Sequence, residues 1–191
     1  DSIMALTRLG PNQAVNLASN VTGTLPVANG GTALTSGFSN GITEADQWRI
    51  TSNWNGGVNP ITANWERNDT VFAKIGTGMS ESSGTLTFPS TGIYKVELLI
   101  LSTKSGGTSQ YNAAKIMMTE NNSSYTERAT GYSSVSLDGA WGGAYVQANM
   151  DVTDTANIKV QFGVVNQSAS DFLGNTGVNK TTATFTRIGD T

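Results

Sequence analysis

The chain contains neither cysteine nor histidine. Without cysteine there is no disulfide framework and no thiolate nucleophile. The absence of both residue types excludes Ser-His-Asp and Cys-His catalytic sites and the usual zinc sites. A glycosidase would need two facing carboxylates, and the sequence gives no reason to pair the two candidates Glu66 and Glu97. We therefore predict that the protein is not an enzyme.

Charge is also scarce, since only 13% of the residues are charged and the formal net charge is −3. The eleven Lys and Arg residues are scattered along the chain. Nucleic-acid binding needs clustered cations that displace counterions, so this class of partner is not expected. No apolar run approaches the roughly 20 residues of a membrane-spanning helix, and membrane insertion is not expected either. The first residues, "DSIMALTRLG", lack an initiator methionine and a signal-peptide pattern, as in a fragment or processed chain.

Strand patterns dominate after residue 40. In "GIYKVELLIL" (92–101) the first half alternates and the second half is apolar on both sides, which is typical of a strand that enters a covered core. Further strands are predicted at 47–51, 113–120, 124–132, 143–150, 157–165 and 182–189, with separators rich in Gly, Asn, Ser and Asp. "TEADQW" (43–48) hints at one helical turn. The sequence therefore predicts an all-β, antiparallel jelly-roll sandwich over residues 41–191.

Residues 1–40 form a separate segment of different composition, predicted to be a fibre shaft. In "NVTGTLPVANGGTALTSG" (20–37) the main large apolar side chains are Leu25, Val27 and Leu34. One copy cannot offset the entropy of ordering its backbone, about 1–2 kcal/mol per residue. Three copies around one axis would pool these side chains into a thin shared core, and the two adjacent glycines would allow a tight turn. The alternative is a flexible linker, for which Leu-Pro-Val is a poor composition.

Two motifs resemble known proteins. "GTLPVANGG" (23–31) resembles the repeated shaft element of bacteriophage tail fibres, although that element usually continues with Thr-Gly and this chain with Thr-Ala. The region from Asp46 onward is similar to C1q/TNF-like jelly-roll heads, notably those of marine bacteriophage structural proteins. The residues that carry this resemblance are "DQWRIT", "NWERNDT", "IGTGMSESSGTLTFPSTGIYKV" and "FTRIGDT". The Phe88-Pro89-x-x-Gly92-x-Tyr94 pattern is shared with C1q-like heads in general.

The resemblance implies a ten-stranded jelly roll that assembles as a homotrimer on a shaft. It implies an extracellular virion fibre whose N-terminal end contacts other virion proteins and whose head binds a host-surface glycan or protein. Two alternatives stay open: a purely structural fibre or capsid decoration, and a secreted C1q-like lectin. The chain has no collagen-type stalk and no cysteine, so complement-like partners are not carried over.

Calcium and tryptophan need separate consideration. C1q-like heads often hold calcium, and the spacing of Asp151 and Asp154 in "DVTDTAN" is compatible with it, but these are also ordinary turn residues. We expect no metal or other cofactor. Trp48, Trp54 and Trp65 either stack on carbohydrate or, as we favour, are buried where the shaft meets the head and in the first strands.

Strand parity predicts where recognition occurs, because successive connections between antiparallel neighbours lie at alternate ends of a jelly roll. If strand 182–189 ends at the base beside the shaft, the connections 77–84, 102–112, 133–142 and 166–181 lie at the opposite, apical end. Long loops on a rigid scaffold often carry binding sites. The receptor-binding candidates are therefore Tyr111, Asp138, Trp141, Asp171 and Phe172. Trp141, predicted in an exposed loop, and Phe172 lead because aromatic side chains dominate binding energetics; alternatively, both plug the top of the trimer axis.

Overall fold

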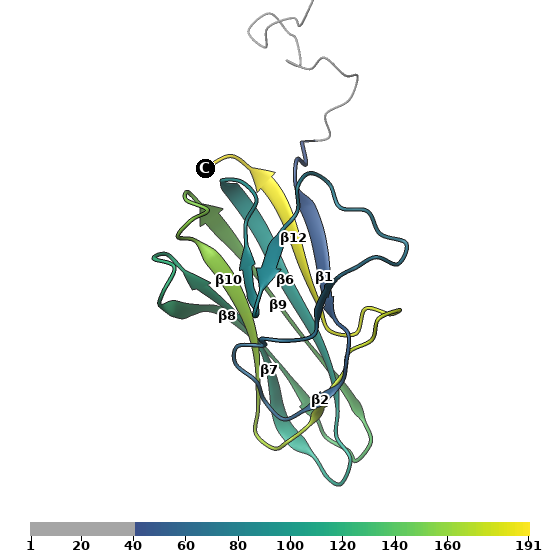
Figure 1. Cartoon of the computed structure of the whole chain (residues 1–191). Coiled ribbons are helices and arrows are strands. Elements are labelled where there is room, and N and C mark those ends of the chain that lie inside the picture. The colour runs from purple at the N-terminus through teal and green to yellow at the C-terminus, as the bar shows by residue number, and fades with distance from the viewer. Residues whose placement is uncertain (1–40) are drawn as a thin grey trace, which may run out of the picture. The chain divides into compact units, whose positions relative to one another are not determined.

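The computed structural model describes residues 41–191, which form one unit that we call the head. Its twelve strands form two antiparallel sheets (Figure 1). Sheet A contains β1 (Ala45–Ile50), β2 (Trp54–Asn55), β3 (Trp65–Arg67), β6 (Gly92–Thr103), β9 (Trp141–Val152), β11 (Asp171–Phe172) and β12 (Thr182–Gly189). Sheet B contains β4 (Ser80–Ser82), β5 (Thr85–Thr87), β7 (Ser109–Thr119), β8 (Tyr125–Val135) and β10 (Lys159–Asn166).

The predicted all-β antiparallel architecture is confirmed. Ten of the strands fit the ten implied by the resemblance, and the other two, β2 and β11, form a two-residue ribbon. This ribbon pairs with β6 at Ser102 and Thr103, where β12 no longer reaches, because β12 begins opposite Leu99. Residues 41–191 contain no helix that could cross a membrane. "TEADQW" (43–48) contributes most of its length to β1 instead of forming a helical turn.

Strand β6 occupies the centre of sheet A. It pairs with β9 over all twelve of its residues and with β12 on its other side. Its alternation places Tyr94, Val96, Leu98 and Ile100 in the core, each no more than 1% exposed. Because successive residues of a strand face opposite sides, the residues between these four face out of the sandwich.

The register of the strands shows which connections lie at each end of the sandwich, and so tests the predicted apical connections. We call the end where β1 begins the base and the opposite end the apex. Connections 104–108, 136–140 and 167–170 lie together at the apex, since Thr103 pairs with Trp141, and Asn166 with Asn112. Residues 173–181 instead run beside the end of β1, where Ile50 exchanges backbone hydrogen bonds with Thr181 and Asn175.

Segment 77–84 is not apical, so this part of the parity prediction is wrong. Strands β4 and β5 are only three residues long and form a local hairpin beside the basal end of β10. Their turn, Ser83-Gly84, has positive φ at both residues, as a two-residue type I′ turn requires. The parity count assumed that every strand spans the full height of the sandwich.

The three early tryptophans are structural, as favoured. Trp48 lies in the core, and its indole Nε1 donates to the buried Asp46 carboxylate at 3.0 Å. Trp65 packs against the core and donates to the carbonyl oxygen of Ile61 at 3.0 Å. Trp54 stacks on Phe172 with ring centroids 5.3 Å apart. These rings are engaged with the protein interior and are not a carbohydrate platform.

Two glycines allow strands β8 and β9 to approach each other along one side of the sandwich. Strands β8 and β9 belong to different sheets, yet a Cβ added at Gly131 of β8 would lie 2.1 Å from the carbonyl oxygen of Tyr145 in β9. Gly142 of β9 similarly approaches the carbonyl oxygen of Ser134, which a Cβ would meet at 3.0 Å. Only residues without a side chain permit this approach of two backbones.

We predict that Gly131→Ala lowers the free energy of unfolding by roughly 1–3 kcal/mol, because the new methyl group displaces a backbone carbonyl. Gly143→Ala is the matched control, since its Cβ would meet the Leu101 Cδ2 atom at 3.4 Å and the Ile100 carbonyl oxygen at 3.8 Å, both ordinary contacts. Urea denaturation of both variants measures the difference. Equal stabilities for the two variants would contradict this account of the β8–β9 approach.

Candidate functional site

Exposed aromatic side chains gather on the outer face of sheet A. Trp141 and Tyr145 alternate along β9 and are 64% and 51% exposed. Tyr145 lies opposite Leu99 and Trp141 opposite Thr103, while half-buried Leu101 lies opposite a glycine between them. We call Leu99, Leu101, Trp141 and Tyr145 the sheet A patch. The patch is apolar, and no strand of the head covers this face of sheet A.

A charged network adjoins the sheet A patch on its basal side. The Glu97 carboxylate accepts hydrogen bonds from the Tyr145 hydroxyl and from Lys95 Nζ, the latter at 2.7 Å. Burial pushes the pKa of Glu97 upward, but the hydrogen bonds from Lys95 and Tyr145 together outweigh it and lower the pKa. The same hydrogen bond to Glu97 raises the pKa of Tyr145. The network therefore orients the Tyr145 ring.

We predict that the stabilising effect of Glu97 disappears in acid. Because its folded-state pKa is lowered, the contribution is present above the ordinary value of about 4.3 and is lost as pH falls through the lowered pKa. Glu97→Gln should therefore reduce the free energy of unfolding at neutral pH by at most about 1 kcal/mol. Denaturation of wild type and variant across pH should show this gap closing below about pH 4. A gap that widens in acid would contradict the assignment.

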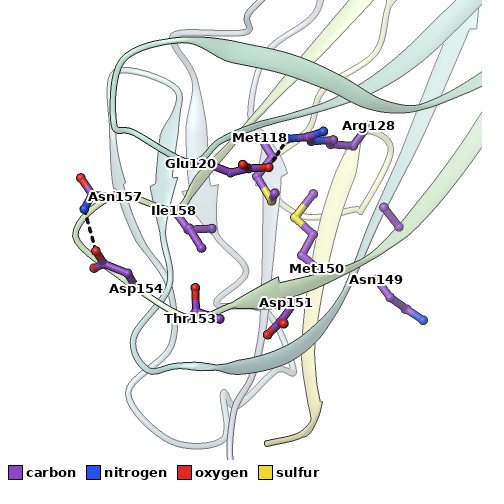
Figure 2. A pocket seen from close by; sticks show the side chains of 11 residues that line it. Met118, Glu120, Arg128, Asn149, Met150, Asp151, Thr153, Asp154, Asn157 and Ile158 are labelled. Carbon is purple, nitrogen blue, oxygen red and sulfur yellow. Dashed lines mark hydrogen bonds and ion pairs between the residues drawn. The ribbon is translucent and has the colours of Figure 1, made fainter. Parts of the chain in front are cut away.

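A pocket of about 720 Å³ opens between the two sheets at the base. The sandwich is closed near the apex by the glycines of β8 and β9, and it parts toward the base. Figure 2 shows the side chains of Met118 and Met150 in the middle of the pocket, with the Glu120–Arg128 ion pair on one side. The rest of the lining comes from Ala148, Asn149, Asp151, Thr153, Asp154, Asn157 and Ile158.

Asp154, on the rim of this basal pocket, is hydrogen-bonded within its own turn. Asp154 accepts hydrogen bonds from the backbone N–H of Ala156 at 2.7 Å and from Asn157 Nδ2 at 2.6 Å. These hydrogen bonds lower the pKa of Asp154, the backbone one most strongly. The residue therefore caps its own turn. Among residues 41–191 no group of three or more Asp, Glu, Cys or His side chains is placed to hold a metal ion.

A second pair of exposed aromatics lies on the outer face of sheet B, near the apex. Tyr111 of β7 and Tyr132 of β8 are 40% and 67% exposed, with ring centroids 6.1 Å apart and planes at 81°. A β-bulge sets this arrangement: Gln110 and Tyr111 together oppose Ser134, because the register shifts between Ser109 and Asn112. Bulges re-aim side chains and recur beside functional sites.

A polar hollow of about 220 Å³ adjoins the two tyrosines. It is lined by Thr108, Ser109, Gln110, Ser134, Val135 and Ser136. Val135 and Ser109 are fully buried, and the Ser109 hydroxyl donates within the chain, so Thr108, Gln110, Ser134 and Ser136 supply the polar atoms. We call this hollow together with Tyr111 and Tyr132 the tyrosine surface. None of its residues is charged.

The five predicted receptor-binding residues are not brought together in one site. Tyr111 and Trp141 are exposed on opposite sheets, and Trp141 is the first residue of β9, not a loop residue. Asp138 joins two apical loops by accepting from the Gly106 N–H at 2.7 Å. Asp171 accepts from Asn55 Nδ2 at 2.8 Å. Each aspartate thus has a structural partner.

Phe172 is a wrong prediction as a binding residue. Its side chain is fully buried, because it faces the core from β11 and stacks on Trp54. It is also not an apical plug, since its burial is complete within one protomer. The predicted shaft core residues Leu25, Val27 and Leu34 lie outside the described residues. Tyr132 was missed, although it shares the exposed side of β8 with Ser134, because the predicted strand ended at that residue.

The two carboxylates considered for glycoside hydrolysis are separated. Glu66 lies on β3 and Glu97 on β6, three strands apart in sheet A. At about 4.8 Å per strand the separation is roughly 14 Å, beyond the 5–10 Å that glycosidases use. Glu66 is paired with buried Arg49 at 2.8 Å, and Glu97 with Lys95.

The architecture matches solved structures. Eiger TNF from S. frugiperda superposes with a TM-score of 0.60 at 13% identity, covering 77% of this chain and 93% of that one. Murine APRIL at pH 5.0 superposes with a TM-score of 0.55 at 12% identity, covering 75% and 98%. The head has a TNF-like jelly-roll fold. At these identities the likeness concerns the fold; no protein-family model and no curated protein matches the chain.

Proposed function

We propose that this protein is a non-enzymatic bacteriophage fibre protein whose homotrimeric jelly-roll head binds the host cell surface during adsorption. The shaft motif and head motifs of the sequence support the viral part of this proposal, and the TNF-like fold supports a trimeric head. The structural observation that carries the proposal is the concentration of uncovered features along β9.

Strand β9 supports self-association in three ways. It ends sheet A and β8 ends sheet B, and away from Gly131 and Gly142, where the two strands approach each other, neither has a partner strand on that side. Strand edges without a partner favour contact with another chain. The outward residues of β9 supply half of the sheet A patch, and its inward residues help to form the basal pocket. A second copy would cover all three surfaces at once.

The geometry favours a closed ring over a face-to-face dimer. The uncovered edge lies at one side of sheet A, whereas β1 and β3 end the sheet at the other side. Contact between two different surfaces of identical chains generates rings when the rotation closes. Three copies related in this way would bury the sheet A patch near a common axis. The outer face of sheet B would then stay accessible to a host receptor.

We predict that the double variant Leu99→Asp/Leu101→Asp is monomeric. Two carboxylates on the sheet A patch would have to lose their hydration in the subunit contact, which an apolar contact does not repay. Size-exclusion chromatography with light scattering should give three times the 20.0 kDa chain mass for wild type and one chain mass for the variant. Ser82→Asp, on the exposed outer face of sheet B, is the matched control and should stay trimeric. A wild-type chain that is monomeric at micromolar concentration would contradict the proposed homotrimer.

Host binding is tested with the fluorescently labelled full chain and whole bacteria. We expect saturable binding to cells that adsorb the parent phage, and competition by unlabelled chain should reduce phage adsorption. Cells that the phage does not adsorb to are the control. A trimer that binds no cells and leaves adsorption unchanged would instead support a purely structural fibre or capsid decoration.

A further inference from the structure

We propose that the tyrosine surface on sheet B is a binding site for a neutral saccharide. This inference rests on the proposed function, because it assigns the ligand class and the location of host recognition. Trp141, the other exposed aromatic candidate, lies on the sheet A patch that self-association would cover.

The two tyrosine rings offer complementary surfaces to a sugar. Tyr111 and Tyr132 meet at 81°, so one ring can act as a floor and the other as a wall for one small ring. A pyranose ring presents C–H groups on its faces and hydroxyl groups around its rim. The tyrosine rings supply an apolar contact for the faces, and their phenolic hydroxyls stay free to bond the rim.

The adjoining hollow supplies the hydrogen bonds that a polyhydroxylated ligand needs. Among the described residues, the side-chain hydroxyls of Thr108, Ser134 and Ser136 have no hydrogen-bond partner within the chain. Each hydroxyl can donate one hydrogen bond and accept two. Gln110 is held in place by its backbone N–H, which donates to Gln167 Oε1 at 3.0 Å. Unpaired polar groups beside an apolar platform match the alternation of C–H and O–H on a sugar.

The absence of charge on the tyrosine surface selects a neutral ligand. Its eight residues carry no ionisable group apart from the two phenols. Further along the same face, Lys115 Nζ is ion-paired with Glu127 at 2.6 Å, and this hydrogen bond lowers the pKa of Glu127. A sialic acid, a phosphate or a charged peptide would find no partner of opposite charge here. A neutral hexose needs no charged partner, so the uncharged surface does not disfavour its binding.

The β-bulge explains why these groups converge. In a regular antiparallel ladder each residue of β7 would have one partner on β8, whereas here Gln110 and Tyr111 both lie opposite Ser134. Both Gln110 and Tyr111 are consequently exposed in succession. Gly131 holds β8 close against β9, so the strand that carries Tyr132 and Ser134 is fixed from behind. Six of the eight residues of the site therefore lie on paired strands, and Thr108 and Ser136 directly adjoin the ends of those strands.

The experiment uses the full chain and four free sugars, glucose, galactose, mannose and N-acetylglucosamine, observed by saturation-transfer NMR. We expect transfer to at least one of them. Tyr111→Ala and Tyr132→Ala should each weaken its affinity at least about tenfold. Tyr125→Ala is the matched control, because Tyr125 lies at the basal end of the same strand. N-acetylneuraminic acid, the charged comparison, should give less transfer.

Several results would overturn the inference. These are no transfer to any of the four sugars, or equal affinity in wild type, Tyr111→Ala and Tyr132→Ala. Dissociation of the trimer by either tyrosine variant would assign these rings to the subunit contact instead. If the variants do not fold, ring-labelled tyrosine in the wild-type chain decides, since the sugar must shift the Tyr111 and Tyr132 signals and spare Tyr125.

The outcomes also separate this inference from the proposed function. If the trimer binds host cells equally well with and without the two tyrosines, the proposed function stands and the saccharide site is rejected. Sugar binding at the tyrosines of a chain that is monomeric, or that binds no cells, keeps the saccharide site and removes the proposed function.

Discussion

The head depends on the pairing of β6 with its neighbours. All twelve residues of β6 pair with β9, and the other edge of β6 pairs with β12 and then with β11. This central strand fixes the height of the sandwich, the positions of base and apex, and the residues of sheet A that face outward. Because strand side chains alternate with a period of two, a shift of one residue would exchange the core with the surface. Buried Leu98 and Ile100 oppose such a shift, since neither can be exposed without a large loss of apolar burial.

The same alternation separates two kinds of surface. Outward residues of β6 and β9 form the sheet A patch, which is apolar and flanked by a charged network. Outward residues of β7 and β8 form the tyrosine surface, which is uncharged and rich in hydroxyl groups. The two lie on opposite layers, so a contact between subunits on one layer leaves the other open. This separation lets one small sandwich combine self-association with recognition of a ligand.

Glycine controls how the two layers meet. Gly131 and Gly142 bring β8 and β9 together near the apex, which supports the strand that carries Tyr132. Toward the base the layers part, and the space is lined by Met118 and Met150 beneath a charged rim. Methionine is flexible and polarisable, so such a surface can adapt to a neighbouring side chain. The close approach of the two layers near the apex therefore follows from these two glycines.

The sequence alone determined the all-β class and the alternation of β6, because these depend on local periodicity and turn chemistry. The apical position of residues 104–108, 136–140 and 167–170 required in addition the resemblance to C1q-like heads, which placed the last strand at the base. The sequence did not determine the burial of Phe172, the outward face of Trp141 or the meeting of Tyr111 with Tyr132. Phe172 is buried because a two-residue ribbon extends the row of β12, and no local pattern encodes that pairing. The tyrosines meet because a bulge adds one residue to β7 opposite Ser134. Cross-strand register is a property of two distant segments together, so only the tertiary structure decided which side chains share a surface.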